Sequence, residues 1–164
     1  MKYLACFRPS RDLIEKLNRE SGLVVPSSGF HCTLWKFSLL EKDEEAIIEK
    51  LSALTTKSFT AEVIGDAVFD FDSYVLLLRR SESLLDLHTN ILLTSETLDN
   101  DPRLFTEGVI KYGMRNYSPH ITISKGTGRL RLSEEYLGIE MYISQYLLMK
   151  KKDNEWRDVA ILNL

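Results

Sequence analysis

Two stretches of the sequence repeat one pattern: Phe30-His31-Cys32-Thr33-Leu34 and Pro119-His120-Ile121-Thr122-Ile123. Each has a histidine, a threonine two residues later and then an aliphatic residue, and the chain contains only three histidines. The β-branched and apolar residues of both stretches are typical of strands. Because successive side chains of a strand point to opposite faces, each histidine projects beside its threonine. The pattern therefore predicts two strands, each with an imidazole and a hydroxyl on one face and an apolar back.

These four polar side chains suit the chemistry of a phosphate ester if the two strands are neighbours. An imidazole takes or gives a proton near neutral pH, and a threonine hydroxyl donates hydrogen bonds to an oxyanion. One histidine would act as general base and the other as general acid, while Thr33 and Thr122 orient the non-bridging oxygens. We expect the reactive nitrogens of His31 and His120 to lie about 5 to 8 Å apart, so that both reach one phosphate. This division of labour needs no metal, and we predict no cofactor.

Around these stretches, short apolar runs alternate with segments of helical period. No linker rich in Gly, Ser or Pro interrupts them, so the 164 residues are expected to form a single domain, residues 1–164, of the α+β class. The predicted strands cover residues 2–7, 31–37, 59–69, 74–79, 120–124, 139–150 and 156–162. Helices are predicted at residues 11–20 and 41–55 and from residue 81 onward, with a loop at residues 100–103.

The distribution of charge limits the class of ligand. The formal net charge is −3, which excludes a broadly basic protein that coats nucleic acid but permits a local positive pocket. Both histidine stretches lie in windows without Asp or Glu, residues 21–40 and 108–133, although strands are poor in acids in any protein. The basic residues of the second window are Lys111, Arg115, Lys125, Arg129 and Arg131. This distribution favours an anionic ligand near the histidines.

Cysteine usage and hydropathy bear on location. The two cysteines, Cys6 and Cys32, lie in apolar predicted strands, so we expect reduced thiols in a cytoplasmic protein. The apolar run near the N-terminus ends at Arg8 and Pro9 and is too short for a signal peptide. No stretch approaches the length of an apolar membrane span, so we expect no membrane association.

The two His-x-Thr stretches, with Phe37 after the first and Pro119 directly before the second histidine, resemble the signatures of the 2H phosphoesterase superfamily. This superfamily includes 2′-5′ RNA ligase-like proteins and RNA 2′,3′-cyclic phosphodiesterases. The resemblance implies a bilobal α+β fold with pseudo-twofold symmetry, in which two antiparallel sheets face a central cleft and the helices lie outside. It also implies His31 and His120 as the catalytic residues. Ser38 departs from the family pattern, because many relatives have Gly there.

Further residues are candidate ligands of the substrate: Trp35, Ser124, Lys125 and Arg115. By the period of two, Trp35 shares the face of the first histidine, and its indole would stack on a nucleobase unless it fills the core. Ser124 shares the face of the second histidine. Lys125 and Arg115 flank that stretch and would contact phosphate unless they are ordinary surface charges. The third histidine, His88, lies in the apolar stripe of a predicted helix and is expected to be structural.

We therefore expect a metal-independent phosphodiesterase that hydrolyses 2′,3′-cyclic phosphate or 2′-5′ linked ends of RNA or of a small nucleotide. His31 is assigned to protonation of the departing ribose oxygen and His120 to activation of water, although pseudo-symmetry makes these roles interchangeable. The alternatives are a 2′-5′ RNA ligase, a non-catalytic module that binds RNA or a nucleotide, and a metal hydrolase. A zinc site would need a third ligand, and neither cysteine shares a strand face with its nearest histidine. We expect the protein to be a monomer.

Overall fold

The computed structural model describes residues 1–20, 23–26, 28–69, 72–125 and 134–164. The strands are β1 (Lys2–Phe7), β2 (Cys32–Ser38), β3 (Phe59–Phe69), β4 (Ser73–Leu78), β5 (His120–Lys125), β6 (Glu140–Ile143), β7 (Gln145–Lys152) and β8 (Glu155–Asn163). The helices are α1 (Arg11–Asn18), α2 (Glu44–Ser52), α3 (Glu82–Glu96) and α4 (Pro102–Tyr112). Single 3-10 turns form η1 (Glu41–Asp43), η2 (Met114–Asn116) and η3 (Glu134–Tyr136).

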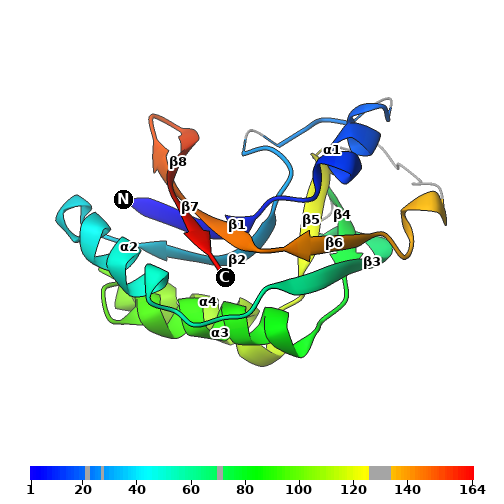
Figure 1. Ribbon diagram of the computed structural model, residues 1–164. Helices are drawn as coiled ribbons and strands as arrows, with labels where there is room; N and C mark the ends of the chain where they lie inside the picture. The colour runs from blue at the N-terminus through cyan, green and yellow to red at the C-terminus, as the bar shows by residue number, and fades with distance from the viewer. Residues whose placement is uncertain (21–22, 27, 70–71, 126–133) are drawn as a thin grey trace.

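The strands form one eight-stranded sheet in the order β6-β3-β4-β5-β2-β1-β7-β8, in which all neighbours are antiparallel. Strands β2 and β5, which carry the His-x-Thr stretches, lie side by side at its centre and are joined by the pairing of Cys32 with Ile121. Four strands lie in each half, and the sheet curls around its open face (Figure 1). The predicted α+β class with two antiparallel halves is thus confirmed, and the two halves join edge to edge into one sheet.

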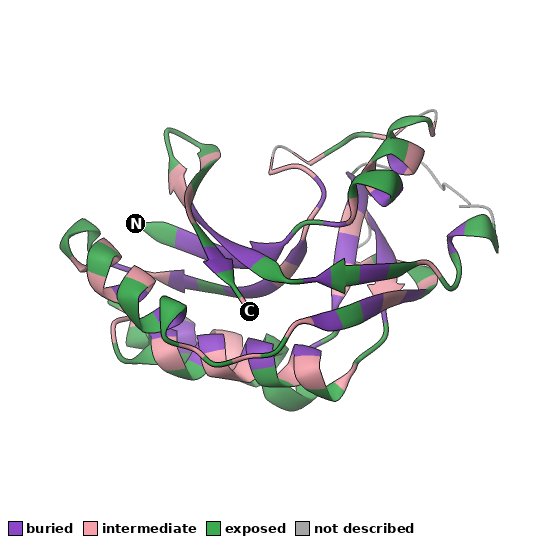
Figure 2. Cartoon of the chain, in the orientation of Figure 1, coloured by how far each residue is buried: buried purple, intermediate pink, exposed green. Residues whose placement is uncertain are grey.

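The helices are divided between the two ends of the molecule. Helices α2, α3 and α4 lie together against one side of the sheet, and α1 lies apart from them (Figure 1), where Lys16 pairs with Glu135 of η3 at 3.0 Å. The buried side chains of α3 pack against β2: Leu84, Leu87, His88, Ile91 and Leu92. Burial is accordingly concentrated along the central strands and the inner side of these helices (Figure 2). Within the described residues, no helix combines the length and the apolar composition that a membrane span requires.

Two elements differ from the sequence-based prediction. Residues 100–103 were expected to form a loop, but α4 begins at Pro102, where the missing N–H of proline costs the helix no hydrogen bond. The strand expected over residues 139–150 breaks at Ser144 into β6 and β7, which pair with different halves of the sheet. The backbone oxygen of Ser144 accepts a hydrogen bond from Leu164 at 2.9 Å. The sequence has no Gly or Pro at this break to indicate it.

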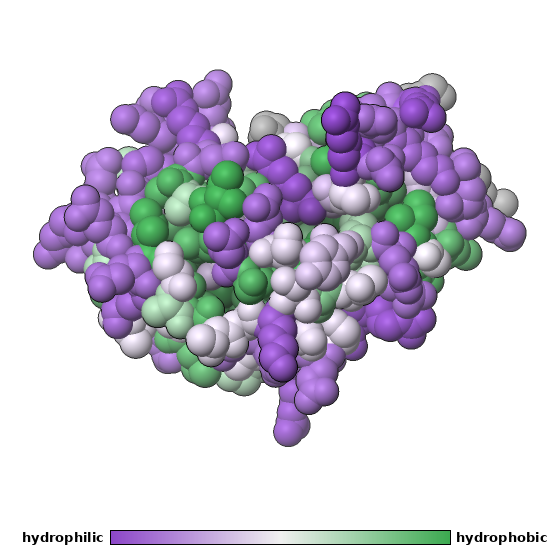
Figure 3. Space-filling view, viewed as in Figure 1, coloured by the Kyte–Doolittle hydropathy of each residue, from purple (hydrophilic) through white to green (hydrophobic). Residues whose placement is uncertain are grey.

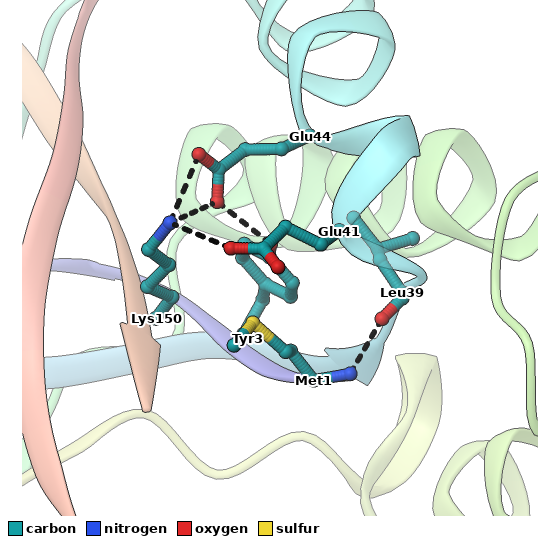
Figure 4. Close-up of polar contacts among 6 residues, drawn as sticks. All are labelled: Met1, Tyr3, Leu39, Glu41, Glu44 and Lys150. Atoms are coloured by element: carbon teal, nitrogen blue, oxygen red, sulfur yellow. Dashed lines mark hydrogen bonds and ion pairs between the residues drawn. The ribbon is translucent and has the colours of Figure 1, made fainter. Parts of the chain in front are cut away.

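A polar cluster holds one half of the sheet against α2 (Figure 4). Lys150 on β7 donates to the two carboxylate oxygens of Glu44 at 3.1 and 2.9 Å, and Tyr3 on β1 donates to the same carboxylate at 2.7 Å. Glu41 lies 4.0 Å from the same ammonium group. Burial acts to raise the pKa of Glu44, but the hydrogen bonds from Lys150 and Tyr3 outweigh it and the pKa is lowered. Glu44 therefore stays ionised while it links β1, β7 and α2.

Replacing Tyr3 by Phe should lower the free energy of unfolding by about 1–3 kcal/mol, because a hydrogen bond to a charged group is lost from a buried position. Tyr142→Phe is the matched control, since Tyr142 is 73% exposed and its variant should stay within about 0.5 kcal/mol of the wild type. Urea denaturation measures both. Equal stability of Tyr3→Phe and the wild-type protein would contradict this role of the cluster.

Candidate active site

The pairing of β2 with β5 brings the two His-x-Thr stretches together. Cys32 and Ile121 lie opposite each other, and both are fully buried in the main core. Their neighbours along each strand therefore point to the opposite side of the sheet. On that side, His31 lies opposite Thr122 and His120 lies opposite Thr33. We call this side the motif face, after the residues it carries: His31, Thr33, His120 and Thr122.

The register also sets the spacing of the two imidazoles. His31 and His120 are diagonal neighbours across the Cys32–Ile121 pair, and such neighbours have Cα atoms about 7–8 Å apart. The charge of His120 acts on the His31 ring, which agrees with this proximity. The spacing is compatible with a single phosphate between the two rings.

Each imidazole is oriented by the same type of backbone contact. The Nδ1 atom of His31 lies 2.9 Å from the carbonyl oxygen of Gly29, and that of His120 lies 2.8 Å from the carbonyl oxygen of Ser118. A carbonyl only accepts, so Nδ1 carries the proton and donates in both rings. The nitrogen that titrates is therefore Nε2 in each histidine. In both cases the carbonyl belongs to the residue two positions before the histidine, and the hydrogen bond fixes the orientation of the ring.

The surroundings of His31 favour its neutral form. Burial lowers its pKa below 6.5, and the positive charges of Lys36, His120 and Arg8 lower it further, although the bond to Gly29 acts in the opposite direction. Arg8 is itself paired with Asp158 at 3.0 Å, which places one carboxylate near this group of cations. An imidazole in this setting accepts a proton more readily once an anion lies beside it.

A bulge in β2 corrects the predicted position of Trp35. Thr33 pairs with Cys6 and Trp35 pairs with Ala5, so Leu34 is an extra residue without a partner. The bulge shifts the alternation by one, and Trp35 turns to the core, where it is 5% exposed and packs edge-on against His88 and Phe105. The expectation that Trp35 shares the face of His31 was therefore wrong, and its indole is not presented to a nucleobase.

A second bulge corrects the position of Ser124 in the same way. Thr122 pairs with Val75 and Ser124 pairs with Tyr74, which leaves Ile123 as the extra residue of β5. Ser124 is 6% exposed and its hydroxyl accepts a hydrogen bond from the backbone of Val24 at 3.0 Å. Ser124 thus fastens the segment before the first motif and does not lie beside His120 on the motif face.

Two stacked rings hold the bulge of β2. The buried His88 places Nδ1 2.6 Å from the carbonyl oxygen of Leu34, and its Nε2 accepts from the backbone of Met114 at 3.1 Å. Tyr117 stacks on this imidazole at 3.9 Å and donates to the carbonyl of Thr33 at 3.0 Å. Both carbonyls next to the bulge are therefore satisfied. His88 has the structural position predicted for it.

The bulges bring two lysines onto the motif face. Lys36 lies opposite Leu4 in β1 and Lys125 lies opposite Ser73 in β4, and both side chains are exposed. Each lysine stands five residues after its histidine, so the two stretches share the longer pattern His-x-Thr-x-x-Lys. Lys125 was a candidate from the sequence, whereas Lys36 and Arg8 were missed. The repeated lysine was the signal that could have identified Lys36.

Aromatic groups reach the motif face at two other positions. Trp156 packs on a small apolar cluster beside Lys36, formed by Leu4, Cys6, Leu147 and Met149. Phe69 lies against the His120 ring, edge to face, with 4.8 Å between the ring centroids. Hydrophilic side chains gather above this region, over the β7–β8 hairpin at one side and α1 at the other (Figure 3). The motif face thus combines cations, hydroxyls and partly exposed rings.

The remaining candidates lie elsewhere. Arg115 is exposed on η2, which packs against α3 and α4, so the structure does not bring it to the motif face. Arg129 and Arg131 lie outside the described residues. Cys6 and Cys32 are free, and burial raises the pKa of each thiol to about 12. In the described ranges, no group of three or more His, Cys, Asp or Glu residues has the arrangement of a metal site.

Comparison with known proteins finds relatives by structure alone. No family model matches the sequence, and no curated protein matches it. TT0787 of Thermus thermophilus has a TM-score of 0.73 at 16% identity, over 100% of this chain and 98% of that one. E. coli LigT in complex with phosphate has a TM-score of 0.70 at 13% identity, over 99% and 96% of the two chains. A further solved structure, a phosphoesterase, has a TM-score of 0.68 at 13% identity, over 99% and 97%.

The chain has the 2H phosphoesterase fold. In this 2H fold the two motif strands occupy the centre of the sheet, and the near-complete coverage of both chains leaves no large insertion or deletion.

The electrostatic account of His31 predicts its titration. In the wild-type protein, the NMR titration midpoint of the His31 ring should lie below 6.5, because burial and nearby cations disfavour the imidazolium. Lys36→Met removes one positive neighbour, so the midpoint should move to higher pH. Lys42→Met, at an exposed position in η1, is the control and should leave it unchanged. A midpoint that does not respond to the loss of Lys36 would contradict the account.

Proposed function

We propose that this protein is a phosphodiesterase that hydrolyses a 2′,3′-cyclic phosphate on a nucleotide or on the end of an RNA. The observation that carries the proposal is the pair of diagonal imidazoles on the motif face. Each has Nδ1 bonded to a backbone carbonyl, and each lies beside the threonine of the other strand. This arrangement supplies one base, one acid and two hydroxyl donors around a position of the size of one phosphate.

The proposed reaction divides two proton transfers between the histidines. The base takes a proton from water, the water oxygen attacks phosphorus, and the bond from phosphorus to the ribose 3′ oxygen breaks. The acid gives its proton to that oxygen, so a 2′-phosphate and a 3′-hydroxyl remain. The lowered pKa of His31 favours the neutral imidazole that a base requires. We therefore assign the base to His31 and the acid to His120, the reverse of the assignment made from the sequence.

Two observations support a nucleotide as substrate. Thr33 and Thr122 flank the phosphate position, and Lys36, Lys125 and Arg8 give the motif face a positive charge that attracts an anion. Solved structures of E. coli LigT, which has the same fold at 13% identity, contain phosphate, NADP+, 3′-AMP or ATP. The cations around His31 also disfavour a divalent metal there, which supports a reaction that needs none.

Loss of either catalytic histidine should abolish most of the activity. His31→Ala and His120→Ala should each lower kcat/KM for adenosine 2′,3′-cyclic phosphate by about a hundredfold or more, because each removes one proton-transfer partner. The double variant should lose little beyond either single variant, since the two groups act as a unit. Activity should persist in EDTA, and the product should be the 2′-phosphate.

Thr60→Ala, at an exposed position of β3, is the control and should keep full activity. Full activity of His120→Ala would overturn the proposal. An RNA substrate with a 2′,3′-cyclic phosphate and a free 5′-hydroxyl separates hydrolysis from ligation, because only attack by the 5′-hydroxyl in place of water forms a 2′-5′ bond. Binding of the cyclic nucleotide without turnover at high protein concentration would instead identify a non-catalytic binding module.

A further inference from the structure

Lys36 and Lys125 occupy equivalent positions in the two halves of the sheet. Each lies five residues after its histidine, and in each strand a bulge between the threonine and the lysine turns the lysine to the motif face. Without the bulges, the period of two would point both lysines to the core. The two bulges therefore have a common effect, which is to add one cation to each end of the group of histidines and threonines.

No acidic side chain of the described residues pairs with these lysines. Within the part of the chain that the structure describes, the ammonium group of neither Lys36 nor Lys125 forms a hydrogen bond or an ion pair, whereas Arg8, Lys16 and Lys150 each pair with a carboxylate. Their ammonium groups are also close enough to repel each other. Although Lys36 reaches solvent, the residues packed around it desolvate its ammonium group in part, which lowers the pKa of Lys36, and the charge of Lys125 lowers it further. Two unpaired like charges on one face are relieved when anions bind beside them.

The positions of the lysines differ in what surrounds them. Lys36 lies opposite Leu4, at the border of the apolar cluster on which Trp156 packs. Its Cα lies three residues beyond that of Thr33, roughly 7 to 10 Å along the strand. A nucleoside stacked against the half-buried Trp156, which covers this cluster, would have one ribose edge toward the histidines and the other toward Lys36. Lys125 has the same offset from Thr122, but it lies opposite Ser73 in β4 and no apolar cluster of this kind borders it in the described residues.

We propose that the substrate carries a second phosphate, on the same nucleoside as the reacting one, and that Lys36 binds it. This inference rests on the proposed function, because it takes the reacting phosphate to lie between the two histidines. A 2′,3′-cyclic phosphate has a single negative charge and leaves one of the two lysines without a counter-ion. A 5′-phosphate on the same nucleoside provides the second anion, at the edge of the ribose that lies away from the 2′ and 3′ oxygens.

The test compares binding of adenosine 2′,5′-bisphosphate with binding of adenosine 2′-monophosphate, measured by isothermal titration calorimetry. The wild-type protein should bind the bisphosphate about tenfold or more tightly than the monophosphate, because one additional charged contact forms. Lys36→Gln should reduce this ratio to about threefold or less, because it weakens binding of the bisphosphate more than binding of the monophosphate. Lys36→Arg should restore the preference, and Lys42→Gln, the exposed control on η1, should leave it intact.

The outcomes separate this inference from the proposed function. A preference for the bisphosphate that depends on Lys36, in a protein without hydrolytic activity, supports the second-phosphate site and refutes the phosphodiesterase. Hydrolysis of the cyclic nucleotide with equal affinity for the two probes overturns the inference and leaves the function in place. A preference that survives Lys36→Gln, or no binding of either probe, also overturns it.

Discussion

The pairing of Cys32 in β2 with Ile121 in β5 joins the two halves of the sheet, and the position of each candidate catalytic group follows from it. Both residues are fully buried, so a shift of this register by one would turn the imidazoles into the core. The Tyr117 hydroxyl strengthens the seam because it donates to the carbonyl of Thr33 and contacts the Cys32 thiol. Burial raises the pKa of this phenol, which keeps it a donor.

The two bulges determine which side chains accompany the histidines. In a regular strand, Trp35 and Ser124 would occupy the motif face and the lysines would be buried. The extra residue in each strand turns Trp35 and Ser124 to the core and the lysines to the motif face. Hydrogen bonds on the core side offset the free-energy cost of each bulge. In β2 the Leu34 carbonyl is bonded by His88, and in β5 the Ser124 hydroxyl is bonded by the backbone of Val24. The third histidine thus supports the site from behind without facing the substrate.

The two His-x-Thr stretches and most element positions were predictable from the sequence because strands and amphipathic helices have characteristic periods. Strand β3 begins and ends at the predicted residues, and Ser81 caps α3 as the pattern indicates. A bulge leaves no such mark, because one extra aliphatic residue looks like any other, so Trp35 and Ser124 were placed on the wrong face. The break at Ser144 was equally invisible, since both β6 and β7 continue the apolar pattern.

The two halves of the site supply the same set of chemical groups. Each half supplies an imidazole, a hydroxyl and an ammonium group from one strand, and the asymmetry comes from the neighbours: Arg8 and Lys36 surround His31, whereas Phe69 lies against His120. Such an environment separates the acid from the base without changing the motif. Phe69 lies edge to face against the His120 ring, with 4.8 Å between the ring centroids.

A crystal structure of the protein with bound 2′-AMP tests the central claim most directly. The account predicts that Nε2 of His31 and Nε2 of His120 both lie within hydrogen-bonding distance of oxygen atoms of the same phosphate, with the hydroxyls of Thr33 and Thr122 on its remaining oxygens. A phosphate held by one histidine alone, or bound away from the motif face, would contradict it.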